Sequence, residues 1–78
     1  MLHQSFTAAP KTHEGKTLVF EETFRSPFEK DTVEDALVVL EKIRSLHSAF
    51  YGWYELGAYI EHLPNGKYRA VRHQAQYK

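Results

Sequence analysis

Histidine is the residue type here with the widest chemical reach, because imidazole can bind a metal or transfer a proton near neutral pH. The chain holds five histidines and no cysteine. His47 falls in a helical apolar pattern and His73 in a strand pattern, so helix–sheet packing could bring them together. Two histidines without an H-x-x-x-H pair or a His-Glu cluster do not complete a zinc site. We therefore expect satisfied core histidines, no metal and no cofactor, with a pH-sensitive pair as the alternative.

Carboxylates are the second group with catalytic potential, and their spacing argues against an enzyme. Glu21 and Glu22 are neighbours in a strand pattern, so their side chains would point to opposite faces. Glu34 and Asp35 open a helical pattern, where the helix dipole favours acids without any catalytic role. The sequence contains no G-x-S-x-G motif, phosphate-binding loop or cysteine nucleophile. We therefore expect no enzymatic activity.

Aromatic residues suggest a different kind of site, on a β-hairpin that spans residues 54–77 and folds about Pro64-Asn65-Gly66. A two-residue type I′ loop at Asn65-Gly66 would pair Leu63 with Tyr68 and place cross-strand partners on the same side. The side apolar enough to receive a helix then carries Tyr54, Leu56, Ala58, Ile60, Val71 and Ala75. The outer side carries Glu55, Gly57, Tyr59, Glu61, Leu63, Tyr68 and Arg72, with Trp53 just beyond.

This outer face is the predicted site, because Tyr and Trp are enriched at the centres of protein interfaces. The predicted partner-binding residues are Trp53, Tyr59, Tyr68, Arg72, Glu55 and Glu61. The alternatives are ordinary strand tyrosines with hydrated hydroxyls, or an N-terminal segment that folds over the face. A bulge at Gly57 would exchange the faces before it, taking Trp53 inward and Tyr54 outward.

The end of the chain also permits a second function, binding of single-stranded nucleic acid. Lys67, Arg69, Arg72 and Lys78 are interleaved with aromatic residues that could stack on bases. Two acids on the same face would repel phosphate, however, and no ribonucleoprotein motif is present. Net charge is zero, and pairing between this basic strand and an acidic stretch before it is the simpler interpretation.

Turn signals and side-chain periodicity define the elements that must position these residues. Residues 17–24 alternate as a strand, with Leu18, Phe20 and Phe24 on one face. A helix is expected from Thr32 to about Ser48, with Asp31 as its N-cap. Its core stripe would comprise Val33, Ala36, Leu37, Leu40, Ile43 and His47, widened on one flank by Val39 and Leu46.

These elements predict an α+β two-layer sandwich in which one helix packs on a three- or four-stranded antiparallel sheet. The order is β-α-β-β, or β-β-α-β-β if residues 2–8 add an edge strand, with residues 1–16 forming that strand and a loop. The first strand of the shorter order should lie beside the last. At 78 residues the chain is expected to form one domain.

Composition supports a globular protein, with 42% hydrophobic and 26% charged residues. No apolar run approaches the roughly 18 residues of a membrane span. The N-terminus lacks the charge and apolar segment of a signal peptide. We therefore expect a cytoplasmic protein without membrane association.

In size and shape this prediction resembles the accessory proteins of phages and mobile elements, including inhibitors of restriction and CRISPR systems. The resemblance implies a non-catalytic module that blocks a larger host protein through the outer sheet face. The other partner that this surface would suit is a second copy of the chain, which would give a homodimer.

Overall fold

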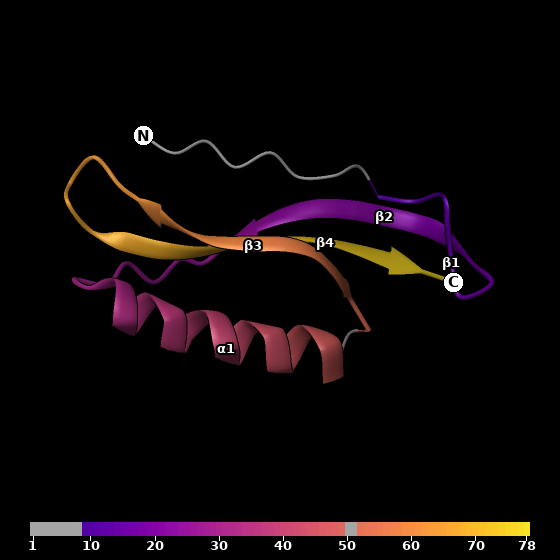
Figure 1. Cartoon of the computed structure of the whole chain (residues 1–78), viewed down its shortest axis with the longest axis horizontal. Coiled ribbons are helices and arrows are strands. Elements are labelled where there is room, and N and C mark those ends of the chain that lie inside the picture. Colours follow the sequence, from indigo (N-terminus) through magenta and orange to yellow (C-terminus); the bar gives the residue numbers. More distant parts are fainter. Residues whose placement is uncertain (1–8, 50–51) are drawn as a thin grey trace.

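One helix packs on one face of a four-stranded antiparallel sheet (Figure 1). The computed structural model describes residues 9–49 and 52–78. The elements are β1 (Thr12–His13), β2 (Lys16–Arg25), α1 (Val33–Ala49), β3 (Tyr54–His62) and β4 (Tyr68–Tyr77). The strands lie in the order β1-β2-β4-β3. The predicted α+β two-layer fold is confirmed, as is the position of β2 beside β4.

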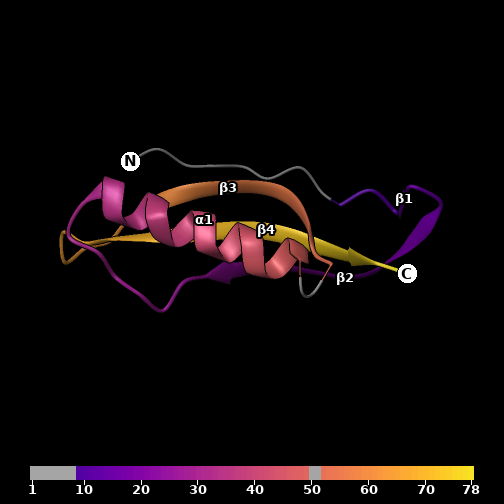
Figure 2. The same ribbon diagram turned by 90° about the horizontal axis from the view of Figure 1, so that it is seen from below.

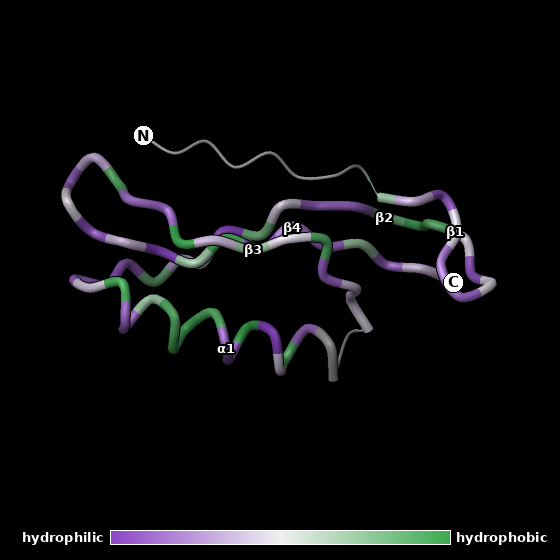
Figure 3. Tube along the Cα trace, in the orientation of Figure 1, coloured by the Kyte–Doolittle hydropathy of each residue, from purple (hydrophilic) through white to green (hydrophobic). Residues whose placement is uncertain are grey.

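The helix lies over β3 and β4, so β2 extends beyond its cover (Figure 2). The core between the layers is small. Leu40, Ile43 and Ala70 are buried at its centre, and Phe24, Val39, Ala58 and Ile60 pack around them. Hydrophobic residues recur along the whole of α1 (Figure 3), more than this narrow contact can cover. Consequently Val33 and Leu37, both expected in the core stripe, are exposed.

The edge strand β1 is built differently from the prediction. The expected strand at residues 2–8 falls outside the described residues, whereas Thr12 and His13 pair with Thr17 and Lys16. The connecting turn has positive φ at both central residues, 52° at Glu14 and 77° at Gly15. That is the requirement of a type I′ hairpin, so this turn type occurs here and not at Asn65-Gly66.

The helix agrees with its predicted span, but its N-cap is one residue later than expected. The Thr32 Oγ1 accepts a hydrogen bond from the Asp35 N–H at 3.1 Å. The Thr32 carbonyl accepts the first intrahelical bond, from the Ala36 N–H. Asp31 instead bonds the Lys67 ammonium. Threonine is in general a weaker cap than aspartate, but here Thr32 takes the cap position while the Asp31 carboxylate accepts from Lys67.

The loop between β3 and β4 has three residues, so the predicted two-residue loop is wrong. Leu63 donates its N–H to the Lys67 carbonyl, and Gly66 donates back to the Leu63 carbonyl. Gly66 has φ of 85°. Pro64 and Asn65 therefore form a type I turn, followed by a glycine in the left-handed region. The extra residue shifts the pairing of β4 by one position, and Tyr68 faces His62 instead of Leu63.

This shift turns β4 over relative to the prediction. Ala70, Arg72 and Gln74 point to the helix side, while Val71, His73 and Ala75 point to the outer side. Val71 and Ala75 are buried but do not lie on the helix side as predicted, and the predicted outer position of Arg72 is wrong. Ala58 and Ile60 lie on the helix side as expected.

A second irregularity affects the start of β3. The register shifts between Glu55 and Gly57, which marks a β-bulge next to Gly57, where an irregularity would exchange the predicted faces. As expected for a bulge, the faces exchange before it. Tyr54 lies outward, with its ring 4.0 Å from that of His13, and Trp53 lies on the helix side against Phe20.

Candidate functional site

The six predicted partner-binding residues do not share one surface. Tyr59 and Glu61 lie on the outer face as expected. Trp53, Glu55 and Arg72 lie on the helix side. Tyr68 also has helix-side parity, at the far end of β4, where it stacks on His62 with ring centroids 4.5 Å apart. The three-residue turn and the bulge together place these six residues on different surfaces, whereas a regular hairpin would place them on one face.

Arg72 is the clearest departure, because its side chain is only 1% exposed. Its Nε lies 3.3 Å from Glu55 Oε1, and its Nη2 donates to the Trp53 carbonyl at 3.2 Å. Burial lowers the pKa of this guanidinium, and the Glu55 carboxylate partly offsets that effect. The arginine is therefore part of the interior and cannot contact a partner directly.

Glu55 binds a second arginine, from the helix. Arg44 donates from Nε to Oε1 at 2.9 Å and from Nη2 to Oε2 at 3.1 Å, which is a bidentate pair. The hydrogen bond to Glu55 raises the pKa of Arg44. One carboxylate thus connects α1 to β3 and β4, so the role the geometry supports for Glu55 is structural.

The outer face is polar and internally paired. Glu61 Oε1 accepts a hydrogen bond from Arg69 Nε at 2.7 Å and lies 3.9 Å from Arg25 Nε. His73 contacts Glu21 Oε2 through Nε2 at 2.7 Å. Val71 and Ala75, although on this face, are fully buried. Among the described residues, the outer face is therefore mainly polar and paired, unlike the open apolar platform expected for a partner.

The four predicted nucleic-acid contacts are equally dispersed. Lys67 bonds Asp31 at 2.8 Å, Arg69 bonds Glu61, and Arg72 is buried. Lys78 lies at the end of the chain, where its backbone pairs with that of Thr17. The acidic stretch thus supplies a partner to Lys67, whereas the acids beside Arg69 and Arg72, Glu61 and Glu55, belong to β3. These side chains do not form a continuous cationic groove.

The two singled-out histidines lie on opposite faces and have separate partners. His47 Nδ1 lies 2.9 Å from Gln74 Oε1, and Gln74 Nε2 donates to Glu22 Oε2 at 3.0 Å. Since the carboxylate only accepts, the amide must face Glu22 with its NH₂ group and His47 with its oxygen. His47 therefore carries a proton on Nδ1. These three hydrogen-bonded side chains connect α1 to β2 through Gln74 of β4.

An open apolar surface lies on the helix side, in a groove between α1 and the segment after β2. It has a volume of about 460 Å³. It is lined by Phe24, Ser26, Pro27, Phe28, Lys30, Val39, Lys42, Ile43, Leu46 and His47. We call this the α1–β2 groove. Two of its large side chains are unusually accessible, Phe28 at 62% and Leu46 at 49%.

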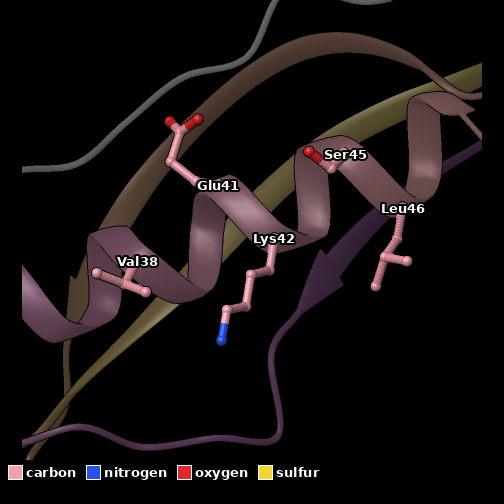
Figure 4. A pocket seen from close by; sticks show the side chains of 5 residues that line it. All are labelled: Val38, Glu41, Lys42, Ser45 and Leu46. Carbon is pink, nitrogen blue, oxygen red and sulfur yellow. The ribbon is translucent and has the colours of Figure 1, made fainter.

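The helix side of the α1–β2 groove continues onto the exposed surface of α1. A shallow hollow there is lined by Val38, Glu41, Lys42, Ser45 and Leu46. Figure 4 shows Lys42 and Leu46 pointing toward the groove, with Glu41 and Ser45 on the other side of the helix. In the described part of the chain, Lys30 and Lys42 form no ion pair, so the groove has a cationic rim.

Sequence reasoning identified part of the α1–β2 groove but gave it another role. The sequence predicts that Val39 and Leu46 widen the core stripe and that Phe24 shares one strand face with Leu18 and Phe20. Phe28 lies outside every predicted element. Its signal was a large aromatic directly after Pro27, in a segment that no regular element could bury.

Comparison with protein-family models, curated proteins and solved structures found no match to this chain. Within residues 9–49 and 52–78, no cluster of three or more His, Asp or Glu side chains could hold a metal ion. Nor is any helix in that part both long and apolar enough to cross a membrane.

Proposed function

We propose that this chain is a non-catalytic protein-binding module that uses the α1–β2 groove, in place of the outer sheet face expected from the sequence. The observation that carries the proposal is the exposure of Phe28 and Leu46 on either side of an apolar hollow. Small domains rarely leave large apolar side chains in a contiguous concave patch unless something covers them. Phe24 and Ile43 supply a partly buried floor.

The partner's contact is an amphipathic segment of a larger protein, with apolar side chains flanked by acids. The apolar side chains match the groove floor, and the acids match Lys30 and Lys42 at its rim. Binding of a short amphipathic segment in an apolar groove is a recurrent mode of recognition. Here the acids would mainly speed association and select the partner, while the apolar contacts would provide most of the affinity.

The proposed mode of action is occlusion, in which the module covers a working surface of a larger host protein in the cytoplasm. This is how accessory proteins of phages and mobile elements with this size and shape act. The support is an analogy of size and fold, which carries less weight than the groove itself.

The test compares two double variants in binding to a partner first captured from host lysate and then purified. Phe28→Ala with Leu46→Ala removes the two exposed groove side chains. Val33→Ala with Leu37→Ala removes exposed apolar side chains of α1 that do not line the groove, and serves as the matched control. Circular dichroism confirms that both variants fold.

We expect the groove variant to lose at least about tenfold in affinity by calorimetry, as truncation of two interface anchors does. The control should bind like the wild type. Equal affinity of the groove variant and the wild type would reject the groove as the contact surface.

A further inference from the structure

The strand β2 has a long open edge. From Val19 to Arg25 its only sheet neighbour among the described residues is β4, because β1 pairs no further along β2 than the Leu18 N–H. Val19 is 56% exposed and Phe20 is 52% exposed. A long, extended edge that carries apolar side chains is a template for pairing with another strand.

The backbone groups that face this edge follow from the ladder. Ser26 donates its N–H to the Ala70 carbonyl, so Ser26 points toward β4. Backbone groups alternate along an antiparallel strand. Phe24 and Glu22 therefore also point toward β4, whereas Glu21, Thr23 and Arg25 present their N–H and C=O groups to the open side.

The other edge of the sheet, β3, is irregular at the end where it leaves the helix. The β-bulge between Glu55 and Gly57 interrupts its register, and the strand curves visibly toward the helix at that end (Figure 1). Bulges of this kind are a recognised way to prevent edge-to-edge association. β2 has a register shift of its own between Leu18 and Phe20, and it pairs regularly with β4 from Phe20 to Arg25.

We infer that β2 pairs antiparallel with β2 of a second copy of this chain, about a two-fold axis at Thr23, which goes beyond the proposed function. Charge complementarity selects the second copy as the occupant. With Thr23 opposite itself, Glu21 of each copy lies opposite Arg25 of the other, on the outer face. Glu21, Thr23 and Arg25 are the residues whose backbone N–H and C=O groups point to the open edge. The ionic pairs therefore coincide with the hydrogen-bonded pairs of the new ladder.

Neighbouring registers lack this match. An axis at Glu22 or at Glu21 would set that carboxylate against its own copy, which is destabilising for directly opposed side chains. An axis at Phe24 would lose both ionic pairs and place Glu21 against Pro27, which has no N–H to donate. The Thr23 register is therefore favoured by charge and by the backbone together.

Pairing in the Thr23 register also changes the helix side. Phe20 and Phe24 of both copies line the same face of the joined sheet, between the two helices. The exposed surface of Phe20 becomes covered, and the two α1–β2 grooves open toward each other across the axis. The dimer would thus present one continuous apolar channel bounded by two helices.

The experiment is a charge exchange read by sedimentation equilibrium over a wide range of protein concentrations. The full chain should approach twice its 9.1 kDa mass as concentration rises. Glu21→Arg alone and Arg25→Glu alone each place like charges opposite each other twice, and should raise the dissociation constant at least about tenfold. The double variant restores both pairs with reversed polarity and should dimerise like the wild type.

Lys16→Glu is the matched control, since it reverses a charge on the same strand but within the part paired to β1. It should dimerise normally, as should the double groove variant at Phe28 and Leu46, which separates this inference from the proposed function. A wild type that stays monomeric at millimolar concentration would overturn the inference. Single variants that dimerise normally, or a double variant that stays monomeric, would overturn it equally.

Discussion

Glu55 is the side chain on which the helix–sheet contact depends most, because it neutralises a buried arginine and binds the helix at once. Glu55→Gln should lower the free energy of unfolding by roughly 2–3 kcal/mol, since it leaves the buried Arg72 charge without its carboxylate. Urea unfolding followed by circular dichroism measures the loss.

Arg44→Met provides the comparison for this cluster. Arg44 is 39% exposed, so water replaces much of what the carboxylate gives it. We expect a loss of less than about 1 kcal/mol for that variant. Equal losses in the two variants would show that the buried arginine does not need Glu55.

The exposed pair of Asp31 and Lys67 predicts how stability responds to extreme pH. The hydrogen bond from Lys67 lowers the pKa of Asp31 below its ordinary 3.8, and the same bond raises the pKa of Lys67 above its ordinary 10.5. The contribution of Asp31 is therefore present above pH 3.8 and is lost as pH falls through its lowered value. The contribution of Lys67 is present below pH 10.5 and is lost as pH rises through its raised value.

NMR titration of the Asp31 carboxyl carbon measures this effect directly. The midpoint should lie below 3.8 in the wild type and return toward 3.8 in Lys67→Met. Since both groups are exposed, added salt should weaken the difference. Identical midpoints in the two proteins would contradict the pairing.

Among the elements, α1 depends on its cap. Thr32→Ala removes the side-chain acceptor for the Asp35 N–H and should cost about 1 kcal/mol of stability. Thr32→Ser keeps the acceptor and should cost much less. Chemical denaturation of both variants tests this, and a loss of similar size in the two would show that the hydroxyl does not cap the helix.

Within the part of the chain that the structure describes, the turn between β1 and β2 holds a non-glycine residue with positive φ. Glu14 has φ of 52°, a conformation that asparagine tolerates better than glutamate. Glu14→Asn should therefore raise the free energy of unfolding by about 0.5–1 kcal/mol, because a type I′ turn favours it. Glu14→Val, which is β-branched, should lower stability, and thermal unfolding of the pair distinguishes the two directions.

The same turns show how far sequence reasoning extends in this chain. Apolar periodicity predicted the span of α1 and the strand β2. The place of β2 beside β4 was expected from the order and connections of the elements, and the structure confirms it. The parity of β4 depended on a single residue, Pro64. Asn65-Gly66 suits a type I′ turn and also the end of a three-residue loop, and local chemistry does not distinguish them.

The predicted partner-binding site depended on the same choice of turn. Because the side chains of β4 point to the faces opposite to those predicted, Arg72 lies in the interior. Tyr59 therefore does not share a face with Tyr68 and Arg72, as the prediction required. The α1–β2 groove was harder to foresee, since it arises from where the helix lies across the sheet. Helical periodicity identifies an apolar stripe but not how much of it the sheet will cover.

At the scale of the whole molecule, one helix covers only part of a four-stranded sheet, and the core is correspondingly thin. A domain of this size has little stability to spare. Pairing of two copies through β2 would add to it by mass action. We therefore expect the midpoint of thermal unfolding to rise with protein concentration.

The control for this prediction is Arg25→Glu, in which the pairing is opposed. Its unfolding midpoint should be independent of concentration over the same range. Scanning calorimetry at several concentrations measures the unfolding midpoint of the two proteins. The same dependence on concentration in both would show that pairing through β2 does not stabilise the fold.

The contact between Trp53 and Phe20 makes the molecule its own reporter. Trp53 is the single tryptophan of the chain, and its ring lies edge-on to Phe20 with centroids 5.9 Å apart. Phe20 belongs to the open edge of β2, so covering that edge would exclude water from the environment of the Trp53 indole. Emission excited selectively at the tryptophan band should shift to shorter wavelength as the edge is covered. Occupancy of this one surface can thus be followed optically in the unlabelled protein.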